Sequence, residues 1–155
     1  MEHWLIITND SEAEPTVSGC KVQATRLGDR FYGIKESAAN AKKLKPGDKV
    51  IFYVAGKQGG YFSADATLRT GLVELTPEGR EKFWHSPAFQ TTHGVFLEDD
   101  VHVWKKKVYL SKAIDEIASF NKFRNNPGNA VRGTIKSLSE DEHQALIALG
   151  DQYGT

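Results

Sequence analysis

The stretch LKPGDKVIFYVAG, residues 44–56, decides the fold of this chain of 155 residues. After the Pro-Gly-Asp sequence, five apolar or aromatic residues run from Val50 to Val54 and lead into a glycine-rich loop, residues 56–60. A short continuous apolar run between turn residues is typical of a buried strand. The next segment, residues 61–68, reads YFSADATL and alternates apolar with polar residues. The two segments therefore predict a β-hairpin that the glycine-rich loop closes.

The alternation in the second strand of this hairpin predicts which side chains face the core. Successive side chains of a strand point to opposite faces of the sheet. Residues 69–75, RTGLVEL, are expected to prolong this strand past a bend at Gly71. The inward set is expected to be Phe62, Ala64, Ala66 and Leu68, and the outward set Tyr61, Ser63, Asp65 and Thr67.

The preceding part of the chain predicts one strand and one helix. HWLIIT, residues 3–8, is a short apolar run and reads as a buried strand. Residues 10–30 are polar and irregular, with at most a short strand near KVQAT, residues 21–25. KESAANAKKL, residues 35–44, contains helix formers and stops before Pro46-Gly47, so a helix is expected there.

The remaining half of the chain predicts a strand between helical segments. Ser139 and Glu142 have the spacing of a capping box, which predicts the start of a closing helix that ends at Gly150. The expected elements are a short helical or irregular insertion at 77–89, a strand at 101–110, a helix at 111–123, a turn at 127–131 and a helix at 139–150.

Length and composition indicate a single domain spanning residues 1–155. The predicted strands would form one curved sheet, most simply a small open barrel, with helices at its rim, so the fold class is α+β or mainly β. The lone cysteine, Cys20, excludes an internal disulfide and suits a reducing compartment. Residues 1–20 carry four acids and no Lys or Arg, unlike a signal peptide, and no apolar run reaches the length of a membrane span. We therefore expect a soluble, cytoplasmic protein and, as the simplest state, a monomer.

The formal net charge is zero, but the charges are segregated along the chain. Residues 21–69 contain ten Lys and Arg residues and four Asp and Glu residues, whereas residues 1–20 and 70–104 are acidic. Such segregation could form a basic face of the kind that contacts phosphates. A solvated helix face is an equally good interpretation of the same pattern.

Catalytic and metal-binding motifs are scarce. His85, His93 and His102 are eight and nine positions apart and have no neighbouring cysteine, so they do not have the spacing of a zinc site. The glycine-rich loop lacks the Lys and Ser or Thr that complete a phosphate-binding loop. No Ser-His-Asp set can be singled out. We expect no metal, no cofactor and no catalytic residue.

Aromatic residues occur close to several predicted turns. Tyr53, Phe62 and Trp104 are expected to be core residues. Tyr32 and Trp84 lie in the polar contexts DRFYGIK and KFWHSP, where a large ring requires another explanation. Stacking on a flat ligand is one such explanation, since an aromatic ring contributes about 1–3 kcal/mol per stacked base.

Taken together, HWLIITND, RFYGIKESAANAKKLKPGDKVIFYVAG, GGYFSADATL and AVRGTIKSLSEDEHQALI resemble the EVE domain of the PUA-like superfamily, which is related to the YTH and ASCH domains. The resemblance covers nearly the whole chain. It implies a curved β-barrel of five or six strands with peripheral helices. It also implies a non-enzymatic module that recognises a modified nucleobase in DNA or RNA through an aromatic-lined pocket.

The resemblance also implies the positions of the binding residues. The exit of the first strand would supply Thr8 and Asn9, and the aromatic-Gly-Ile step would supply Tyr32, Gly33 and Ile34. Trp84 would form the opposite wall, with Phe83 and Phe89 as alternatives. Ser63 would add a hydrogen bond to the base. Phosphates flanking the base would be held by Arg30, Lys35 and Lys42.

Two other functions stay open. The ASCH relatives include amidohydrolases that act on an acylated nucleoside and carry a Gly-x-Lys-x-x-Glu-x-Arg pattern. Gly33 and Lys35 fit this pattern, but Ala38 and Asn40 replace the acid and the guanidinium. Glu36 stands two residues too early, which on a helix would turn it about 200° away from the required place. The other alternative is a protein-interaction module without a ligand.

Overall fold

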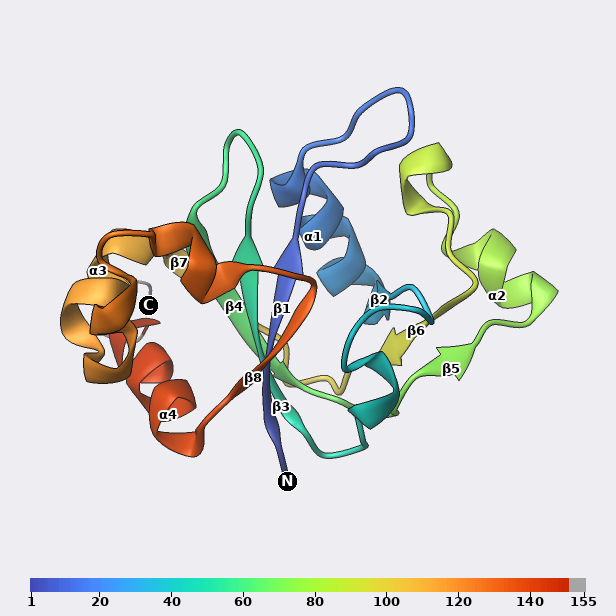
Figure 1. Cartoon of the computed structure of the whole chain (residues 1–155). Coiled ribbons are helices and arrows are strands. Elements are labelled where there is room, and N and C mark those ends of the chain that lie inside the picture. Colours follow the sequence, from blue (N-terminus) through green and yellow to red (C-terminus); the bar gives the residue numbers. More distant parts are fainter. Residues whose placement is uncertain (151–155) are drawn as a thin grey trace.

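The predicted hairpin forms the centre of a five-stranded sheet (Figure 1). The computed structural model of the chain describes residues 1–150. The strand order is β7-β4-β3-β1-β8, and β3 and β4 pair antiparallel, which confirms the hairpin. β1 runs parallel to β3 along its whole length, from His3 opposite Lys49 to Thr8 opposite Val54. The strands of this sheet are β1 (His3–Thr8), β3 (Lys49–Val54), β4 (Tyr61–Thr67), β7 (His102–Tyr109) and β8 (Ile135–Leu138).

A second, three-stranded sheet has the order β2-β6-β5. Its strands are β2 (Phe31–Gly33), β5 (Val73–Glu74) and β6 (His93–Phe96). An isolated antiparallel β-bridge pairs Leu68, just after β4, with Leu97, just after β6. The α+β class is thus confirmed. The strand pairing forms two open sheets, so the curved barrel of five or six strands that the resemblance implied is not confirmed.

The Pro-Gly-Asp turn before β3 is an anchor for the N-terminal strand. Asp48 is buried, and its Oδ2 accepts hydrogen bonds from Trp4 Nε1 (2.9 Å) and from the backbone N–H of Lys45 (3.0 Å). Its Oδ1 accepts from the backbone N–H of Glu2 at 3.0 Å. Burial acts to raise the pKa of Asp48, but these donors outweigh it and lower the pKa below the usual value. The turn therefore fixes β1 beside β3 through one ionised carboxylate.

The second half of the polar segment before β2 is a helix, so the short strand expected near residues 21–25 is wrong, whereas residues 10–18 contain no helix or strand, as expected. α1 spans Gly19–Asp29 and is capped by Ser18, whose side chain accepts from the N–H of Lys21. Two of its buried residues are the polar Gln23 and Arg26. Because polar side chains occupy part of the buried face, the apolar period that identifies a helix is weak in this segment.

The helix expected at residues 35–44 is also wrong, since this segment forms turns and only one 3₁₀ turn, η1 (Ala41–Lys43). Asn40 has a φ of 69°, in the left-handed region, which ends a regular helix at that point. Its side chain donates a hydrogen bond to the carbonyl oxygen of Ile135 at 3.0 Å. A long-range contact of a turn residue therefore overrides the helix propensity of the local sequence.

The expected pattern of the second hairpin strand fails at a β-bulge. The pairing register shifts between Phe52 and Tyr53 and again between Phe62 and Ala64. Ala64 and Ala66 consequently lie in one core cluster and Phe62 in the other, although all are buried as expected. Tyr61, expected to face outward, is only 3% exposed. Residues 69–75 leave the strand, and β5 joins the second sheet instead of prolonging β4.

The second half of the chain contains the strand and the helical segments that the sequence predicts, and also β6 and β8, which it did not predict. The capping box of Ser139 and Glu142 is present at the start of the last helix, which confirms that prediction. Residues 111–123 are helical in two pieces, and residues 127–131 form a 3₁₀ turn. The remaining elements are α2 (Pro77–Lys82), η2 (Pro87–Phe89), α3 (Leu110–Glu116), η3 (Ala118–Phe123), η4 (Pro127–Val131) and α4 (Glu140–Leu149).

The central strands β1 and β3 of the five-stranded sheet are buried on both faces, whereas most residues of the edge strand β7 are exposed. One face packs toward β2 and β6, with Ile6, Phe52 and Tyr32 in its core cluster. The other face packs against α3, η3 and α4 through a cluster that includes Leu5, Trp104 and Leu146 (Figure 1). Trp104 is thus a core residue, as predicted. Within residues 1–150, no helix has the length and hydropathy of a membrane-spanning segment.

Candidate functional site

A cavity of about 430 Å³ opens where β1 and β2 end, and we call it the β1–β2 cavity. It brings together Thr8 and Asn9 from the exit of β1 with Tyr32, Gly33 and Ile34 at the end of β2. Lys35 follows at its edge. The other lining residues are Ile7, Asp10, Ser11, Glu12, Ala13, Val22, Arg26, Pro87, Ala88, Gln90 and Thr91. Six of the ten predicted site residues therefore converge on one cavity.

A chain of hydrogen bonds runs from Thr8 and Tyr32, which line the β1–β2 cavity, to Gln23 and Ser63, which do not. The hydroxyl groups of Thr8 and Tyr32 are hydrogen-bonded to each other. The amide Nε2 of Gln23 donates to Thr8 Oγ1 at 3.3 Å, and the hydroxyl of Ser63 donates to Gln23 Oε1. Burial raises the pKa of Tyr32 to about 12, so its hydroxyl stays protonated at neutral pH. The orientation of the cavity floor is therefore set by a hydrogen-bond network that starts on β4.

Tyr32 belongs mainly to the core. It lies in a strand, not in the looped setting that the sequence suggested, and only 5% of it is exposed. Its ring packs against Phe52 with the ring centroids 5.1 Å apart. The ring therefore supports the cavity wall, while most of its faces contact protein.

Arg26 bonds to η2, which forms one wall of the β1–β2 cavity. Its guanidinium is buried, and Nη2 donates to the carbonyl oxygen of Phe89 at 2.8 Å. The guanidinium also lies over the rings of Phe89 and Phe31, 5.1 and 5.8 Å from their centroids. Burial lowers the pKa of Arg26, although an arginine stays charged in proteins. A buried cation thus ties α1 to the loop across the cavity.

Gly33 leaves room for the side chains packed beside it. A Cβ at position 33 would lie 3.0 Å from Arg26 Nη2 and 3.1 Å from Thr91 Cγ2. The backbone N–H of Ile34 donates to the carbonyl oxygen of His93 at 3.0 Å, so it is already used by the sheet. The glycine accordingly makes room for the protein's own guanidinium beside the cavity.

Asp10 fixes the loop that follows β1. Its Oδ1 accepts from the backbone N–H of Gly19 at 2.8 Å, and its Oδ2 from that of Lys57 at 3.3 Å. These backbone hydrogen bonds lower the pKa of Asp10. One carboxylate therefore joins the exit of β1, the start of α1 and the loop of the central hairpin.

Four of the predicted residues lie elsewhere. Trp84 follows α2, is 48% exposed and does not line the β1–β2 cavity. Ser63 and Arg30 line a different cavity, on the other side of α1. Lys42 lies on the surface, where its Nζ is 4.0 Å from Glu36 Oε1.

The alternative aromatic walls do not close the cavity either. Phe83 stacks on Phe31 with centroids 4.5 Å apart, and Phe89 lies under Arg26. Tyr32 is the one aromatic residue among those that line the cavity within residues 1–150. The structure therefore does not contain the sandwich of two aromatic faces that the resemblance implied.

The sequence did not single out Gln23, Arg26 or Asp10. Each acts through a partner that is distant along the chain: Thr8, the carbonyl group of Phe89, and the N–H of Lys57. Asp10 had one usable signal, because Asn9-Asp10 directly follows a buried strand, where cavity residues often lie. Gln23 and Arg26 had none, since their helix was not recognised.

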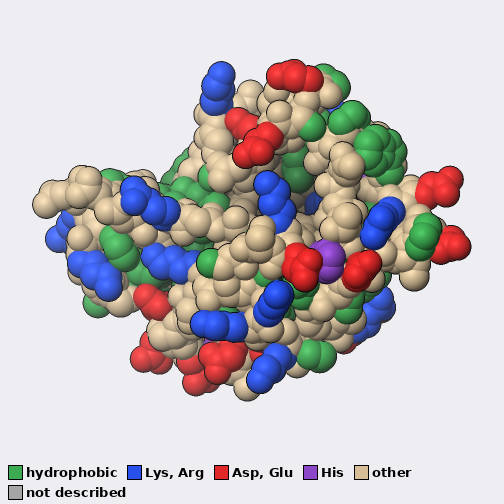
Figure 2. Space-filling model, turned by 45° about the vertical axis from the view of Figure 1, so that its right-hand side comes forward, with side chains coloured by type: hydrophobic (Ala, Val, Ile, Leu, Met, Phe, Trp, Pro, Cys, Tyr) green, Lys and Arg blue, Asp and Glu red, His purple; other side chains and the backbone are tan. Residues whose placement is uncertain are grey.

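The charged groups near the cavity are mixed in sign. The face shown in Figure 2 carries acidic and basic side chains intermixed, without one continuous basic patch. Glu36 lies 3.6 Å from His93 Nε2, as well as near Lys42, and does not line the β1–β2 cavity. Within the described part of the chain, no three His, Cys, Asp or Glu side chains form a group that could hold a metal ion.

Comparisons with known proteins find similarity in structure but not in sequence. No protein-family profile and no curated protein sequence matches the chain. Among solved structures, human THYN1 in complex with DNA containing 5-methylcytosine is similar over 97% of this chain and 98% of its own, with a TM-score of 0.62 and 13% identity. The chain has the fold of this domain.

Two further structures support the same fold. The DUF55 domain of human thymocyte nuclear protein 1 matches with a TM-score of 0.59 and 14% identity, over 96% of this chain and 98% of that domain. The YTH domain of Zygosaccharomyces rouxii MRB1, in complex with N6-methyladenosine RNA, matches with a TM-score of 0.57 and 11% identity. The match covers 96% of this chain and 86% of that one. The resemblance to the EVE and YTH domains is therefore confirmed at the level of the fold.

Proposed function

We propose that the chain is a non-enzymatic module that binds a modified nucleobase in DNA or RNA, and that the base enters the β1–β2 cavity. The observation that carries the proposal is the convergence of Thr8, Asn9, Tyr32, Gly33 and Ile34 on one cavity. THYN1 binds DNA containing 5-methylcytosine in a structure of the same fold, and the YTH domain binds N6-methyladenosine RNA. A cavity of about 430 Å³ is in the range of small-ligand sites.

Recognition in this cavity relies on polar groups and on the edge of one ring. Asn9 is exposed at the mouth and offers both an amide donor and a carbonyl acceptor. The hydroxyl pair of Thr8 and Tyr32 lies at the floor, and one of its two protons remains available after the pair has bonded to each other. An extruded base would be read by these groups, as bases are in other proteins that flip them.

A second cavity adjoins the first and provides a path for the flanking nucleotides. Its lining includes Asn9, Tyr53, Arg132 and five glycines, and Asn9 borders both cavities. The glycines leave the backbone accessible to a sugar-phosphate chain, and Arg132 supplies a cation. In this proposal Lys35 and Arg132 contact phosphates on the two sides of the base. Arg30 and Lys42 do not border either cavity and are replaced in that role.

The amidohydrolase alternative has no observation in its favour. Hydrolysis of an amide needs a group that moves a proton. Glu36 is engaged near Lys42 and His93, outside the cavity. Asp10 lines the cavity, but each of its carboxylate oxygens accepts a backbone hydrogen bond, and these bonds lower its pKa and so make it a weaker base. We therefore retain the reader as the proposed function.

The proposal is tested by fluorescence anisotropy with short oligonucleotides that carry one modified base, 5-methylcytosine in DNA or N6-methyladenosine in RNA, and with unmodified strands of the same sequence. At least one modified strand should bind more tightly than its unmodified match. Asn9→Ala should reduce this preference, because Asn9 contacts the base, whereas the matched control Lys106→Ala on β7 should not. Equal affinity for every modified and unmodified strand would contradict the proposal.

A further inference from the structure

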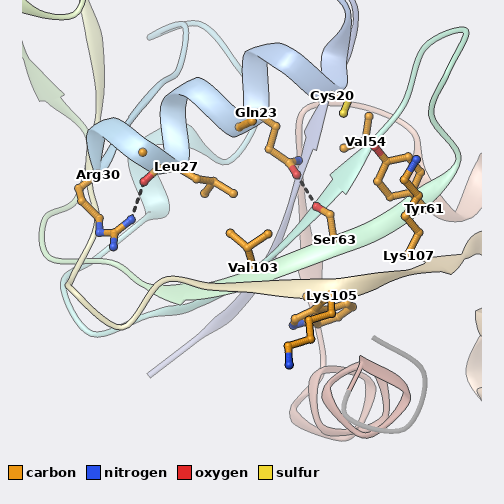
Figure 3. A pocket seen from close by; sticks show the side chains of 13 residues that line it. Cys20, Gln23, Leu27, Arg30, Val54, Tyr61, Ser63, Val103, Lys105 and Lys107 are labelled. Atoms are coloured by element: carbon orange, nitrogen blue, oxygen red, sulfur yellow. Dashed lines mark hydrogen bonds between the residues drawn. The ribbon is translucent and has the colours of Figure 1, made fainter. Parts of the chain in front are cut away.

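A separate cavity of about 380 Å³ lies between α1 and the β4–β7 side of the large sheet, and we call it the α1–β7 cavity (Figure 3). Cys20, Gln23, Ala24 and Leu27 face it from α1, at the spacing of one helix face. Val22 and Arg26 line the β1–β2 cavity from the other side of the same helix. α1 therefore separates two cavities that have different linings.

The walls of the α1–β7 cavity are mostly apolar. Ala24, Leu27 and Val54 form part of them, together with the ring of Tyr61. Val103, the second residue of the edge strand β7, stands on the opposite wall and is 60% exposed. Figure 3 shows Val103 pointing from β7 toward the helix. The cavity thus leaves apolar surface that a ligand could remove from water.

The polar groups are few and are arranged at defined places. The Ser63–Gln23 hydrogen bond lies along the floor, as Figure 3 shows. Lys107 Nζ lies over the ring of Tyr61, 4.5 Å from its centroid, at one end of the cavity. Arg30 lies at the other end, where Nη1 donates to the carbonyl oxygen of Leu27 at 2.7 Å and its remaining N–H groups stay available.

The lining is cationic overall. No Asp or Glu occurs among the residues that line the α1–β7 cavity within residues 1–150. Lys105 also borders it, but Figure 3 shows its side chain pointing away from the helix. Apolar walls between two cations complement one kind of molecule, a flat apolar body that carries an anionic group.

We propose that the α1–β7 cavity is a second binding site, specific for a small amphipathic anion whose ring or chain packs against Leu27, Val54 and Val103 while its acidic group pairs with Lys107 or Arg30. This site is distinct from the β1–β2 cavity and does not depend on the proposed recognition of a base. Burial of the apolar body supplies most of the affinity, and the cations select for negative charge.

The test uses two probes with the same rings, anilinonaphthalene sulfonate and N-phenyl-naphthylamine, which lacks the sulfonate. Both should gain fluorescence on binding the intact protein, and the sulfonate should bind several-fold more tightly. Lys107→Ala should weaken the sulfonate about threefold, the scale of one exposed charge pair, and leave the neutral probe nearly unchanged. Lys106→Ala, the neighbouring lysine outside the lining, is the matched control.

Two further measurements place the probe in this cavity. Val103→Glu puts a carboxylate on an exposed position, so it should be tolerated by the fold and should weaken the sulfonate by roughly tenfold or more through repulsion and lost apolar contact. Cys20 is the only cysteine and is exposed, so its reaction with a thiol reagent should slow when the sulfonate is bound. Equal binding of the two probes, or sulfonate binding unchanged by both substitutions with Cys20 unprotected, would overturn the proposal.

Discussion

The position of Tyr32 gives the sharpest prediction about the site. If its ring were an exposed cage wall, Tyr32→Ala would abolish binding and leave stability unchanged. In the structure the ring is 5% exposed and packs on Phe52, so the same substitution removes a core side chain. We expect Tyr32→Ala to lower the free energy of unfolding by about 3–5 kcal/mol, the range for a buried aromatic ring replaced by alanine.

The hydroxyl of Tyr32 should contribute a smaller, separable amount. Tyr32→Phe keeps the ring and removes one hydrogen bond to Thr8, whose Oγ1 still accepts from Gln23. Because Thr8 is not left without a partner, we expect a loss of about 1 kcal/mol. Trp84→Ala should change stability by no more than about 0.5 kcal/mol, since Trp84 is half exposed.

Urea denaturation followed by circular dichroism measures all three variants, and anisotropy with the tightest-binding oligonucleotide measures their affinity at a temperature where each is folded. The expected order of destabilisation is Tyr32→Ala, then Tyr32→Phe, then Trp84→Ala. The reasoning is refuted if Tyr32→Ala retains the full free energy of unfolding, or if Trp84→Ala removes binding while Tyr32→Phe does not affect it.

Three further predictions concern the anchor, the glycine and the phosphates. Asp48→Asn should lower the free energy of unfolding by about 2 kcal/mol at pH 7, because it weakens a charged acceptor of three N–H groups. The pKa of Asp48 is lower in the folded state than the value of about 3.9 expected in the unfolded state. The loss of stability in Asp48→Asn should therefore be complete above a pH of about 3.9 and should disappear as the pH falls through the folded pKa. Urea titrations at several pH values measure it. Gly33→Ala should cost about 1–3 kcal/mol in the same assay, because its Cβ would crowd Arg26 Nη2 at 3.0 Å; an unchanged midpoint would contradict that packing. Lys35→Ala should weaken oligonucleotide binding and reduce the salt slope by about one, and a slope equal to that of the unaltered protein would remove Lys35 from the phosphate contacts.

The sequence predicted those parts of the fold that depend on local signals. The apolar run of β3, the glycine-rich loop and the capping box of Ser139 and Glu142 each determine their element within a few residues, and each is present. α1 and the turns of residues 35–44 were missed because they depend on contacts with distant parts of the chain. Gln23 and Arg26 are buried polar residues with distant partners, and Asn40 bonds to Ile135, so tertiary contacts decide these segments.

The sequence predicted the site residues correctly only where they lie at the ends of strands. Thr8 and Asn9 end one strand and Gly33 ends another, so any fold that places these ends together brings the residues into one cavity. Ser63 was misplaced because it lies at the β-bulge of β4, where the pairing register shifts. Trp84 was misplaced because Phe83, its neighbour, takes the buried position against Phe31. Neither the bulge nor the choice between adjacent aromatic rings has a signal in the local sequence.

The central claim, that the β1–β2 cavity receives a modified base, is tested most directly by amide chemical-shift changes on titration with an oligonucleotide that carries one modified base and with its unmodified match. The account predicts that the shifts specific to the modified strand fall on Thr8, Asn9, Gly33 and Lys35, which line that cavity. It would be contradicted if the two strands gave the same shifts, or if the modification-specific shifts fell around Trp84 or on the α1–β7 cavity while Thr8 and Gly33 stayed unchanged.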